Sequence, residues 1–275
     1  MSGLELTGLE GKVAVITGAG RMRSIGRPIA VEMAKAGCRV VVTGSGRPKE
    51  QYPDDEKEAG WRDIESVADE VRAVGGKVLA TVSDVGDEIA VRALLQKTMG
   101  EFGQVDFVVN NAGAARGVDR VPVIDMPIDA WDNVIRVNLR GTFLMSKVFG
   151  RQMIEAGKGG CIVNISSIAG KILPPNASAY AASKAGIQAL TASMAQEVGQ
   201  YGVRVNAICP GLIDTFRLDD IRGTPAWDMS TQRISLRRMG SGEEIAWSTI
   251  YLCSDQGAWV TGQSINVDGG MAVQH

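Results

Sequence analysis

Short apolar runs alternate along the chain with segments in which apolar residues recur at helical spacing. The runs are rich in β-branched residues and end at Gly, Asn or Asp, which is typical of buried strands. They are VAVIT (13–17), RVVVTG (39–44), KVLATVSDV (77–85), DFVVNNAG (106–113), CIVNISS (161–167), VRVNAICPG (203–211) and a last run near 263–268. The segments between them predict helices near 25–36, 64–74, 88–100, 129–154, 179–201 and 243–253.

This alternation predicts a parallel sheet that is covered by helices on both faces. The chain shows no linker, no repeat of fixed period and no low-complexity tract. We therefore predict an α/β fold in which residues 1–275 form one doubly wound, Rossmann-type domain of about seven strands. In such a sheet ligands bind at the carboxyl ends of the strands.

Two segments interrupt the alternation. Residues 45–62 are polar and contain proline, and they make a long connection after the second strand. We interpret them as a solvated surface excursion, with a binding loop as the alternative. Residues 214–240 follow the carboxyl end of a strand and mix Arg, Asp, Trp and Met without a period. Because ligands bind at that edge, we predict that 214–240 is a substrate loop.

Composition and charge exclude several classes of function. Of 275 residues, 45% are hydrophobic and 22% charged, as in ordinary globular proteins. Lys plus Arg number 29 and Asp plus Glu 31, so the net charge of −2 gives no basic footprint for nucleic acid. The single histidine is His275, the last residue. A histidine base and nearly all zinc-hydrolase sites are therefore excluded, and no metal is expected.

The cysteines and the ends of the chain bear on its compartment. Four cysteines lie far apart without a C-x-x-C pair, and we expect buried, reduced thiols at Cys38, Cys161, Cys209 and Cys253. Reduced thiols suit a reducing cytosol. The N-terminus shows no signal peptide, and no apolar run approaches the ~18 residues of a membrane span. We therefore predict a cytoplasmic protein that does not associate with membranes.

The first strand runs into a glycine-rich turn. In TGAGRMRSIG, glycines at 18, 20 and 26 permit a tight turn and a close approach of backbone to phosphate. The following helix then begins with its N–H groups and dipole facing the anion. SDV (83–85) and NNAG (110–113) end two further strands at the same edge of the sheet. Together these features predict a dinucleotide site.

Eight motifs in order resemble those of the short-chain dehydrogenase/reductase family. They are TGAGRMRSIG, SDV, NNAG, VNLRG, NISS, YAASK, VNAICPG and INVDGG, and they cover residues from about 10 to 270. The resemblance implies an NAD(P)-dependent oxidoreductase that interconverts a secondary alcohol and a ketone, acting on CH-OH and C=O groups without a metal. It also implies a homotetramer built partly from the helices near 129–154 and 179–200 and from the C-terminal strand.

The resemblance assigns residues to the cofactor. Gly18, Arg23, Ile25 and Gly26 line the pyrophosphate, Asp84 and Val85 hold the adenine, and Asn111, Ala112 and Gly113 pass the ribose. Pro210, Gly211, Ile213 and Thr215 meet the nicotinamide. The usual pattern is TG-x-x-x-G-I-G, but here two residues are inserted and Ser24 replaces the middle glycine. We expect the Ser24 hydroxyl to donate to the pyrophosphate.

Tyr180 and Lys184 in YAASK lie four residues apart, on one face of a helix. A nearby ammonium lowers the pKa of a phenol, so Tyr180 can exchange a proton with the substrate oxygen while hydride moves. Ser167 precedes Tyr180 by the family interval and is expected to bind the substrate oxygen, with Ser166 as the competitor. Asn138 matches the asparagine that holds a water beside the lysine.

Two alternative functions remain open. An enoyl-thioester reductase of the same superfamily shares the longer turn with serine, although that branch spaces its Tyr and Lys by seven. A redox sensor that binds nucleotide without turnover is the other alternative, although such proteins usually lose the Tyr or Lys. The substrate is also open among a sugar, a ketoacyl thioester, a steroid and a cyclic alcohol. The substrate loop offers apolar Phe216, Trp227 and Met229, and offers Arg217, Arg222 and Arg233 for a carboxylate.

The end of the second strand bears on cofactor choice. NAD-specific members of this fold place an acidic residue there, where Gly44 stands in this chain. Ser45 and Arg47 follow, and Arg23 approaches from the glycine-rich turn, with Arg21 as its substitute. Arginine contacts to a 2′-phosphate are charge-assisted. We therefore predict a preference for NADP(H), with NAD(H) use possible.

Overall fold

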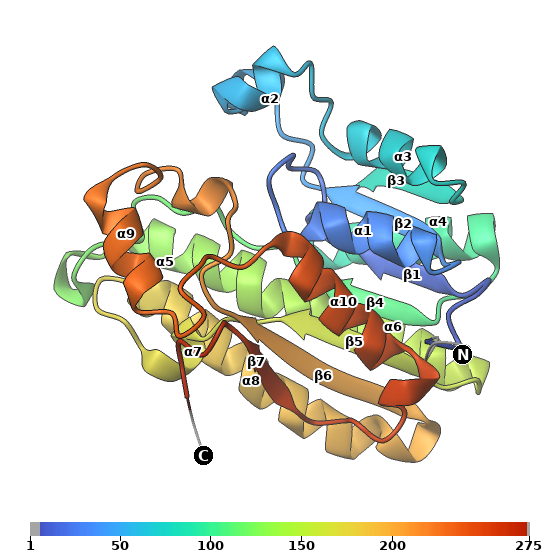
Figure 1. Ribbon diagram of the computed structural model, residues 1–275. Helices are drawn as coiled ribbons and strands as arrows, with labels where there is room; N and C mark the ends of the chain where they lie inside the picture. Colours follow the sequence, from blue (N-terminus) through green and yellow to red (C-terminus); the bar gives the residue numbers. More distant parts are fainter. Residues whose placement is uncertain (1–5, 274–275) are drawn as a thin grey trace, which may run out of the picture.

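Seven parallel strands pair in the order β3-β2-β1-β4-β5-β6-β7 in the computed structural model, which describes residues 6–273 (Figure 1). The strands are β1 (Val13–Ile16), β2 (Arg39–Gly44), β3 (Val78–Val82), β4 (Phe107–Asn110), β5 (Gly160–Ile165), β6 (Val203–Pro210) and β7 (Ser264–Val267). Each predicted strand is present, and the doubly wound α/β fold is confirmed. The strand order reverses between β1 and β4, which is where such sheets bind dinucleotides.

Helices cover both faces of the sheet (Figure 1). They are α1 (Gly26–Lys35), α2 (Asp54–Glu58), α3 (Ile64–Ala73), α4 (Glu88–Phe102), α5 (Ile128–Val134), α6 (Gly141–Ala156), α7 (Ala169–Ile172), α8 (Ser178–Val198), α9 (Pro225–Gln232) and α10 (Gly242–Cys253). Helices α1, α3 and α10 pack on one face, and α4, α6 and α8 on the other.

The apolar runs are continuous because both faces of each strand are buried. In β1, Ala14 and Ile16 join the core under α1, α3 and α10, whereas Val13 and Val15 join the core under α4, α6 and α8. Successive side chains of a strand point to opposite faces, so every residue of such a strand must be apolar. The two cores hold the strand ends in fixed positions, and the functional site is built on them.

The helix predicted at 129–154 is interrupted. A π-helical stretch, Ile135–Arg140, separates α5 from α6, and it contains the fully buried Asn138. Wide π turns are rare and often lie at functional sites. The interruption therefore coincides with a residue that the family resemblance singles out.

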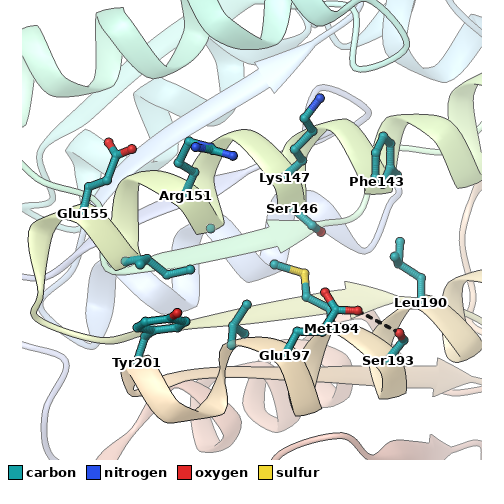
Figure 2. Close-up of a pocket in the computed structure, with 13 residues that line it drawn as sticks. Phe143, Ser146, Lys147, Arg151, Glu155, Leu190, Ser193, Met194, Glu197 and Tyr201 are labelled. Carbon is teal, nitrogen blue, oxygen red and sulfur yellow. Dashed lines mark hydrogen bonds between the residues drawn. The ribbon is translucent and has the colours of Figure 1, made fainter.

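A groove lies between α6 and α8 on the outer surface of the helix layer (Figure 2). Apolar side chains form its floor, including Phe143, Leu190 and Met194, and charged side chains form its rim. We call this surface the α6–α8 groove. It lies within the region that the resemblance implies for assembly.

The remaining expectations concern the cysteines, membrane-spanning helices, metal sites and the single histidine. All four cysteines are free and buried, as predicted. Among residues 6–273, no helix is long and apolar enough to cross a membrane. The same residues contain no group of three His, Cys, Asp or Glu side chains arranged to hold a metal ion. The prediction that no histidine acts as a base concerns His275, the single histidine, and that residue lies outside the described residues.

Candidate active site

The glycine-rich turn is pressed against the end of β4. Gly18 has φ +65°, and a Cβ there would lie 2.6 Å from Ala112 Cα. A Cβ on Gly26 would lie 2.5 Å from Asn111 Nδ2. That amide donates to the carbonyls of Thr17 and Gly18, both at 2.9 Å. Glycine is therefore required at both positions, and Asn111 joins the ends of β1 and β4.

Ser24 is hydrogen-bonded within the turn, and its expected hydrogen bond to the pyrophosphate stays a prediction. Its Oγ donates to the Arg21 carbonyl at 2.9 Å and accepts the Arg27 N–H at 3.2 Å. The hydroxyl proton is thus used inside the turn, because the two inserted residues curl the chain back over Ser24. Ile25 then leads directly into α1, whose N-terminus faces the turn.

The long connection after β2 is more than a surface excursion. The Trp61 indole N–H donates to the Gly20 carbonyl at 2.6 Å, and Glu56 accepts the Met22 N–H at 2.9 Å. Glu56 and Tyr52 are buried. Residues 45–63 therefore fold back onto the glycine-rich turn, and the interpretation as a solvated excursion is wrong. We call residues 45–63 the β2 flap.

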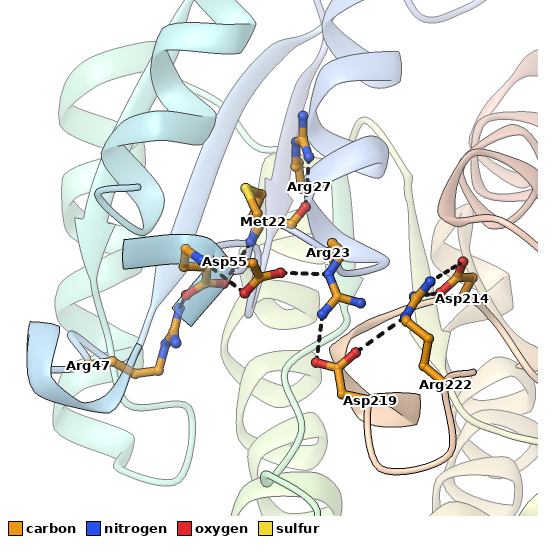
Figure 3. Close-up of polar contacts among 9 residues, drawn as sticks. Met22, Arg23, Arg27, Arg47, Asp55, Asp214, Asp219 and Arg222 are labelled. Atoms are coloured by element: carbon orange, nitrogen blue, oxygen red, sulfur yellow. Dashed lines mark hydrogen bonds and ion pairs between the residues drawn. The ribbon is translucent and has the colours of Figure 1, made fainter. Parts of the chain in front are cut away.

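The two arginines expected to hold a 2′-phosphate are paired with carboxylates (Figure 3). Arg23 donates to Asp55 at 2.7 Å and to Asp219 at 2.6 Å. These two pairs raise the pKa of Arg23, although partial burial opposes the rise. Arg47 donates to the buried Glu56 at 3.0 Å and lies 3.6 Å from Asp63. Carboxylates of the β2 flap and of the substrate loop therefore pair with the two arginines, while one nitrogen of each, Arg23 Nη1 and Arg47 Nη1, has no hydrogen-bond partner. That these arginines hold a 2′-phosphate stays a prediction.

Asp63 takes the place left empty by Gly44. An ideal Cβ on Gly44 would lie 3.5 Å from Asp63 Oδ1, and a Cβ on Gly20 would overlap the same carboxylate. Asp63 has φ +55° and is 6% exposed. A non-glycine residue in this region is strained and is held there by its surroundings. Burial raises the pKa of Asp63, against the opposing effect of Arg47.

The adenine side of the site lies at the end of β3. Asp84 accepts the Gly86 N–H at 2.8 Å and pairs with Arg136 at 2.7 Å. These contacts lower the pKa of Asp84 in spite of partial burial. Val85 is buried against the neighbouring helix layer, and Ser45 is exposed. The predicted adenine residues thus share the carboxyl edge of the sheet with the glycine-rich turn.

Tyr180, Lys184 and Ser167 come together as predicted from their spacing. Lys184 Nζ donates to the Ile165 carbonyl at 2.7 Å and lies 5.6 Å from the centre of the Tyr180 ring. Ser167 lies beside the Tyr180 phenol and contributes to lowering its pKa. The competitor, Ser166, donates instead to the Lys184 carbonyl at 2.9 Å. The geometry therefore favours Ser167 as the partner of the substrate oxygen.

The Tyr180 phenol is shifted towards its ionised form. Burial by itself would raise the pKa of Tyr180, but Lys184, Arg217, Ser167 and Arg120 together lower it. Burial also lowers the pKa of Lys184. A phenol with a lowered pKa exchanges protons more readily near neutral pH.

Asn138 uses its whole side-chain amide within the protein. Its Oδ1 accepts the Ala114 N–H at 2.8 Å, and its Nδ2 donates to Ser183 Oγ at 2.9 Å. Ser183 in turn donates to the Tyr180 carbonyl at 2.7 Å. Asn138 thus connects the chain after β4 to the helix that carries Tyr180, and its water-holding role stays a prediction.

The end of β6 leads into the substrate loop. Gly211 follows Pro210 and has no room for a side chain, because a Cβ there would lie 2.7 Å from Asp268 Cβ. Ile213 and Thr215 are buried. The Phe216 N–H then donates to the Arg23 carbonyl at 3.1 Å. The substrate loop is therefore bonded directly to the glycine-rich turn.

The other candidate substrate-binding residues of the substrate loop differ in whether they lie near Tyr180. Arg222 pairs with Asp214 and lies 5.3 Å from the Trp227 ring, whereas Arg233 and Met229 are exposed. Phe216 lies under the guanidinium of Arg21 at 3.9 Å. Of the three arginines considered for a substrate carboxylate, Arg217 alone lies at Tyr180.

Sequence reasoning missed Arg120. Its guanidinium carbon lies 4.6 Å from the centre of the Tyr180 ring, and that of Arg217 lies 5.3 Å away. No motif contains Arg120, and it precedes Tyr180 by sixty residues. The available signal was its place after NNAG, in a loop that leaves a strand at its carboxyl end.

Comparisons with known proteins give a consistent result. Residues 18–272 match the family described as "Enoyl-(Acyl carrier protein) reductase". The chain is 35% identical over 269 residues to a 3-oxoacyl-[acyl-carrier-protein] reductase of Synechocystis, covering 98% of this chain and 100% of that protein. It is 35% identical over 263 residues to an L-rhamnose 1-dehydrogenase (NAD(P)(+)) of Azotobacter vinelandii, covering 95% and 97%. A short-chain type dehydrogenase/reductase from Mycobacterium marinum superposes with TM-score 0.84 at 33% identity, covering 97% of each chain.

Proposed function

Since the chain belongs to the short-chain dehydrogenase/reductase family, we propose that it interconverts a secondary alcohol and a ketone with a nicotinamide dinucleotide. One observation carries the proposal: the Tyr180 phenol lies beside Ser167 and Lys184, and its pKa is lowered. This arrangement suits proton exchange with a carbonyl or alcohol oxygen.

The residues present fit a dinucleotide. The turn between β1 and α1 holds its backbone against β4 through Gly18 and Gly26, so no side chain covers the floor between them. On the far side, Arg47 Nη1 is buried without a hydrogen-bond partner. An unsatisfied buried donor is costly unless a ligand completes it. The cofactor, when bound, supplies or accepts the hydride.

The protein's own groups account for the proton. In the direction of reduction, Ser167 donates a hydrogen bond to the substrate oxygen, and Tyr180 gives its proton to that oxygen as it becomes a hydroxyl. Lys184 stabilises the phenolate that remains. Asn138 holds the chain after β4 against the helix of Tyr180 and Lys184, which keeps these groups aligned.

The test is reduction of a panel of ketones, followed at the nicotinamide absorbance. We expect turnover that Tyr180→Phe lowers by at least ~10²-fold, the usual contribution of general acid–base catalysis. Tyr251→Phe is the matched control, because Tyr251 lies on α10, outside the candidate site. Titration of cofactor fluorescence should give similar Kd values for all three proteins. Retention of more than about a tenth of the wild-type rate by Tyr180→Phe would refute the assignment.

An enoyl-thioester reductase is the second candidate. It is favoured by the description of the family that residues 18–272 match and by Ser24 in the longer turn. The four-residue spacing of Tyr180 and Lys184 favours carbonyl chemistry instead. Parallel assays with an enoyl thioester and a 3-oxoacyl thioester separate the two. Cofactor binding with no turnover of any substrate would support the redox sensor.

For the cofactor, the structure's charges argue against the NADP(H) preference expected from the sequence, and we propose a preference for NAD(H). Asp63 lies where a carboxylate of this fold accepts hydrogen bonds from the ribose hydroxyls. A 2′-phosphate would meet Asp63 and Glu56, two carboxylates with which Arg47 Nη2 is already paired. Like charges in a buried site repel strongly.

Cofactor affinity tests this proposal without turnover. We expect the wild-type Kd for NADH to be at least tenfold lower than that for NADPH. Asp63→Asn should weaken NADH binding and tighten NADPH binding, so the ratio of the two Kd values should come closer to one. Asp54→Asn is the control, because the Asp54 side chain is on the same flap and 92% exposed. If the wild type bound NADPH more tightly than NADH, and Asp63→Asn did not change this, the preference for NADP(H) predicted from the sequence would hold instead.

A further inference from the structure

The catalytic tyrosine is surrounded by more positive charge than the proposed reaction uses. Lys184 approaches the Tyr180 ring from the buried side, where it is fixed to the Ile165 carbonyl. Arg120 comes from the loop after β4, and Arg217 comes from the 3₁₀ turn Phe216–Leu218 after β6. Lys184 alone meets the need for a cation beside the phenol. The two arginines therefore call for another explanation.

Neither arginine is fully neutralised by the protein. Arg217 donates to the Ala114 carbonyl at 2.9 Å, and no carboxylate among residues 6–273 forms an ion pair with it. Arg120 forms an ion pair with the buried Asp119 through Nε at 3.4 Å, but this Nε makes no hydrogen bond, and no other carboxylate among residues 6–273 pairs with Arg120. By contrast, the nearby Arg116 is paired with Asp220 at 2.9 Å. A half-buried cation that is weakly paired or has no carboxylate partner is costly, and an anionic ligand at this place would offset that cost.

The position of the two guanidinium groups defines what such a ligand looks like. Both lie over the ring whose hydroxyl meets the reacting oxygen. An anion held by them is therefore only a few bonds from the carbonyl carbon. Arginine forks bind carboxylates through paired, charge-assisted hydrogen bonds. A carboxylate one or two carbons from the carbonyl spans this separation.

We infer that Arg120 and Arg217 bind a carboxylate of the substrate, so that the enzyme acts on short oxo acids and the corresponding hydroxy acids. The inference rests on the proposed carbonyl–alcohol reaction. In reduction the carbonyl carbon accepts a hydride from the reduced cofactor, and its oxygen accepts the proton of Tyr180. The ketone becomes a hydroxyl, and the carboxylate is unchanged.

Matched substrates test the inference in the wild type. The probes are 2-oxobutanoate and 3-oxobutanoate, each compared with its methyl ester, which keeps the carbonyl and removes the charge. We expect kcat/KM for at least one acid to exceed that for its ester by tenfold or more. That factor corresponds to about 1.4 kcal/mol, within the range of a hydrogen bond to a charged group. Equal or better reduction of both esters would overturn the inference.

Variants then assign the effect to the two arginines. Arg120→Gln and Arg217→Gln should each lower the ratio of kcat/KM for the acid to kcat/KM for its ester at least tenfold. Reduction is the proper direction, because removing a cation raises the phenol pKa and so keeps Tyr180 protonated. Arg217→Lys should recover part of the loss. Arg233→Gln, an exposed arginine of the same loop, is the matched control.

Three further outcomes distinguish failure of the inference from failure of the proposed function. If Arg217→Gln raised the Kd for the cofactor as much as it lowered turnover, Arg217 would serve the cofactor and the inference would fail. If neutral ketones were reduced through Tyr180 with no advantage for the acids, the inference would fail and the proposed function would stand. If no ketone or oxo acid were reduced at all, the proposed function itself would fail.

Discussion

At the scale of single residues, the charges around one phenol decide how the site responds to pH. Lys184, Arg217 and Arg120 all act on Tyr180, and they outweigh the effect of burial on its pKa. Their contributions differ in kind. Lys184 is buried and bonded to the Ile165 carbonyl, whereas Arg217 stands on the substrate loop. The pKa of Tyr180 therefore depends on whether that loop is in place.

Oxidation of an alcohol needs the ionised phenol, so its rate rises with pH through the pKa of Tyr180. Arg217→Gln removes a cation and should raise that pKa, which moves the rising limb of the kcat/KM profile to higher pH. The check is a pH profile of alcohol oxidation for wild type and variant. Arg233→Gln, which is exposed, should leave the profile in place. A limb that stays fixed or moves to lower pH in Arg217→Gln would contradict the role given to Arg217.

The sequence predicted some of these residues and missed others for a physical reason. Tyr180, Lys184 and Ser167 were accessible because a local spacing and a strand end specify them. Arg120 and Asp63 act through contacts with residues distant in the sequence, and no spacing records such contacts. Arg23 was placed correctly next to the site, but its partners Asp55 and Asp219 lie on two other segments. The local pattern shows a charge and does not show what neutralises it.

At the scale of elements, α10 holds the glycine-rich turn from outside. Its first residue is Gly242, and a Cβ there would lie 2.5 Å from Pro28 Cγ and 2.8 Å from the Ser24 carbonyl. Ser241 and Glu244 form a reciprocal capping box at the start of the helix, and Arg238 pairs with Glu244 at 2.6 Å. The cap therefore fixes the point at which α10 meets the turn.

Glu244→Gln should destabilise the fold by about 1 kcal/mol at pH 7, the usual value of a helix cap. Hydrogen bonds from Arg238 and the Ser241 N–H lower the pKa of Glu244 to about 2. Because the pKa of Glu244 is lower in the folded protein than in the unfolded chain, where it is near 4.3, its ionised form stabilises the fold at pH values above about 4.3. This stabilisation is lost as the pH falls towards 2. Denaturation curves at pH 7 and at pH 3 measure the difference.

The difference in the free energy of unfolding between wild type and Glu244→Gln should therefore be smaller at pH 3 than at pH 7. Glu243→Gln is the matched control, because Glu243 is in the same helical turn and exposed. A difference that is absent at pH 7, or that widens as the pH falls, would contradict the assignment of the cap.

The conformation of the β2 flap could not be predicted from the pattern of hydrophobic and polar residues. The strands and most helices follow from burial periodicity, since the sheet buries both faces of each strand. The flap contains only a 3₁₀ turn, Lys49–Gln51, and the short helix α2. It is positioned by Trp61, Glu56 and Arg47, which bond to other parts of the site or to each other. Its acids look solvated in the sequence because their partners are elsewhere.

At the scale of the whole molecule, two unpartnered surfaces bear on assembly. The first is the α6–α8 groove, where Phe143 is 44% exposed (Figure 2). Lys147, Arg151 and Glu155 of α6 and Glu197 of α8 also line it. A two-fold axis across the groove brings opposite charges of two copies together. The second surface is the sheet edge at β7, beside the fully exposed Trp259.

We propose that a second copy of this chain covers each surface, which gives a homotetramer with two kinds of two-fold interface. Light scattering on the eluting protein should then return about 116 kDa, four times the 29.1 kDa chain. Phe143→Arg places a charge on the apolar floor of the groove and should reduce the mass to about half, because the interface at β7 survives. Ile124→Arg is the matched control, since Ile124 is 89% exposed and lies outside the groove. A particle of one chain for the wild type at micromolar concentration, or a Phe143→Arg protein with unaltered mass, would show that the α6–α8 groove is not an interface.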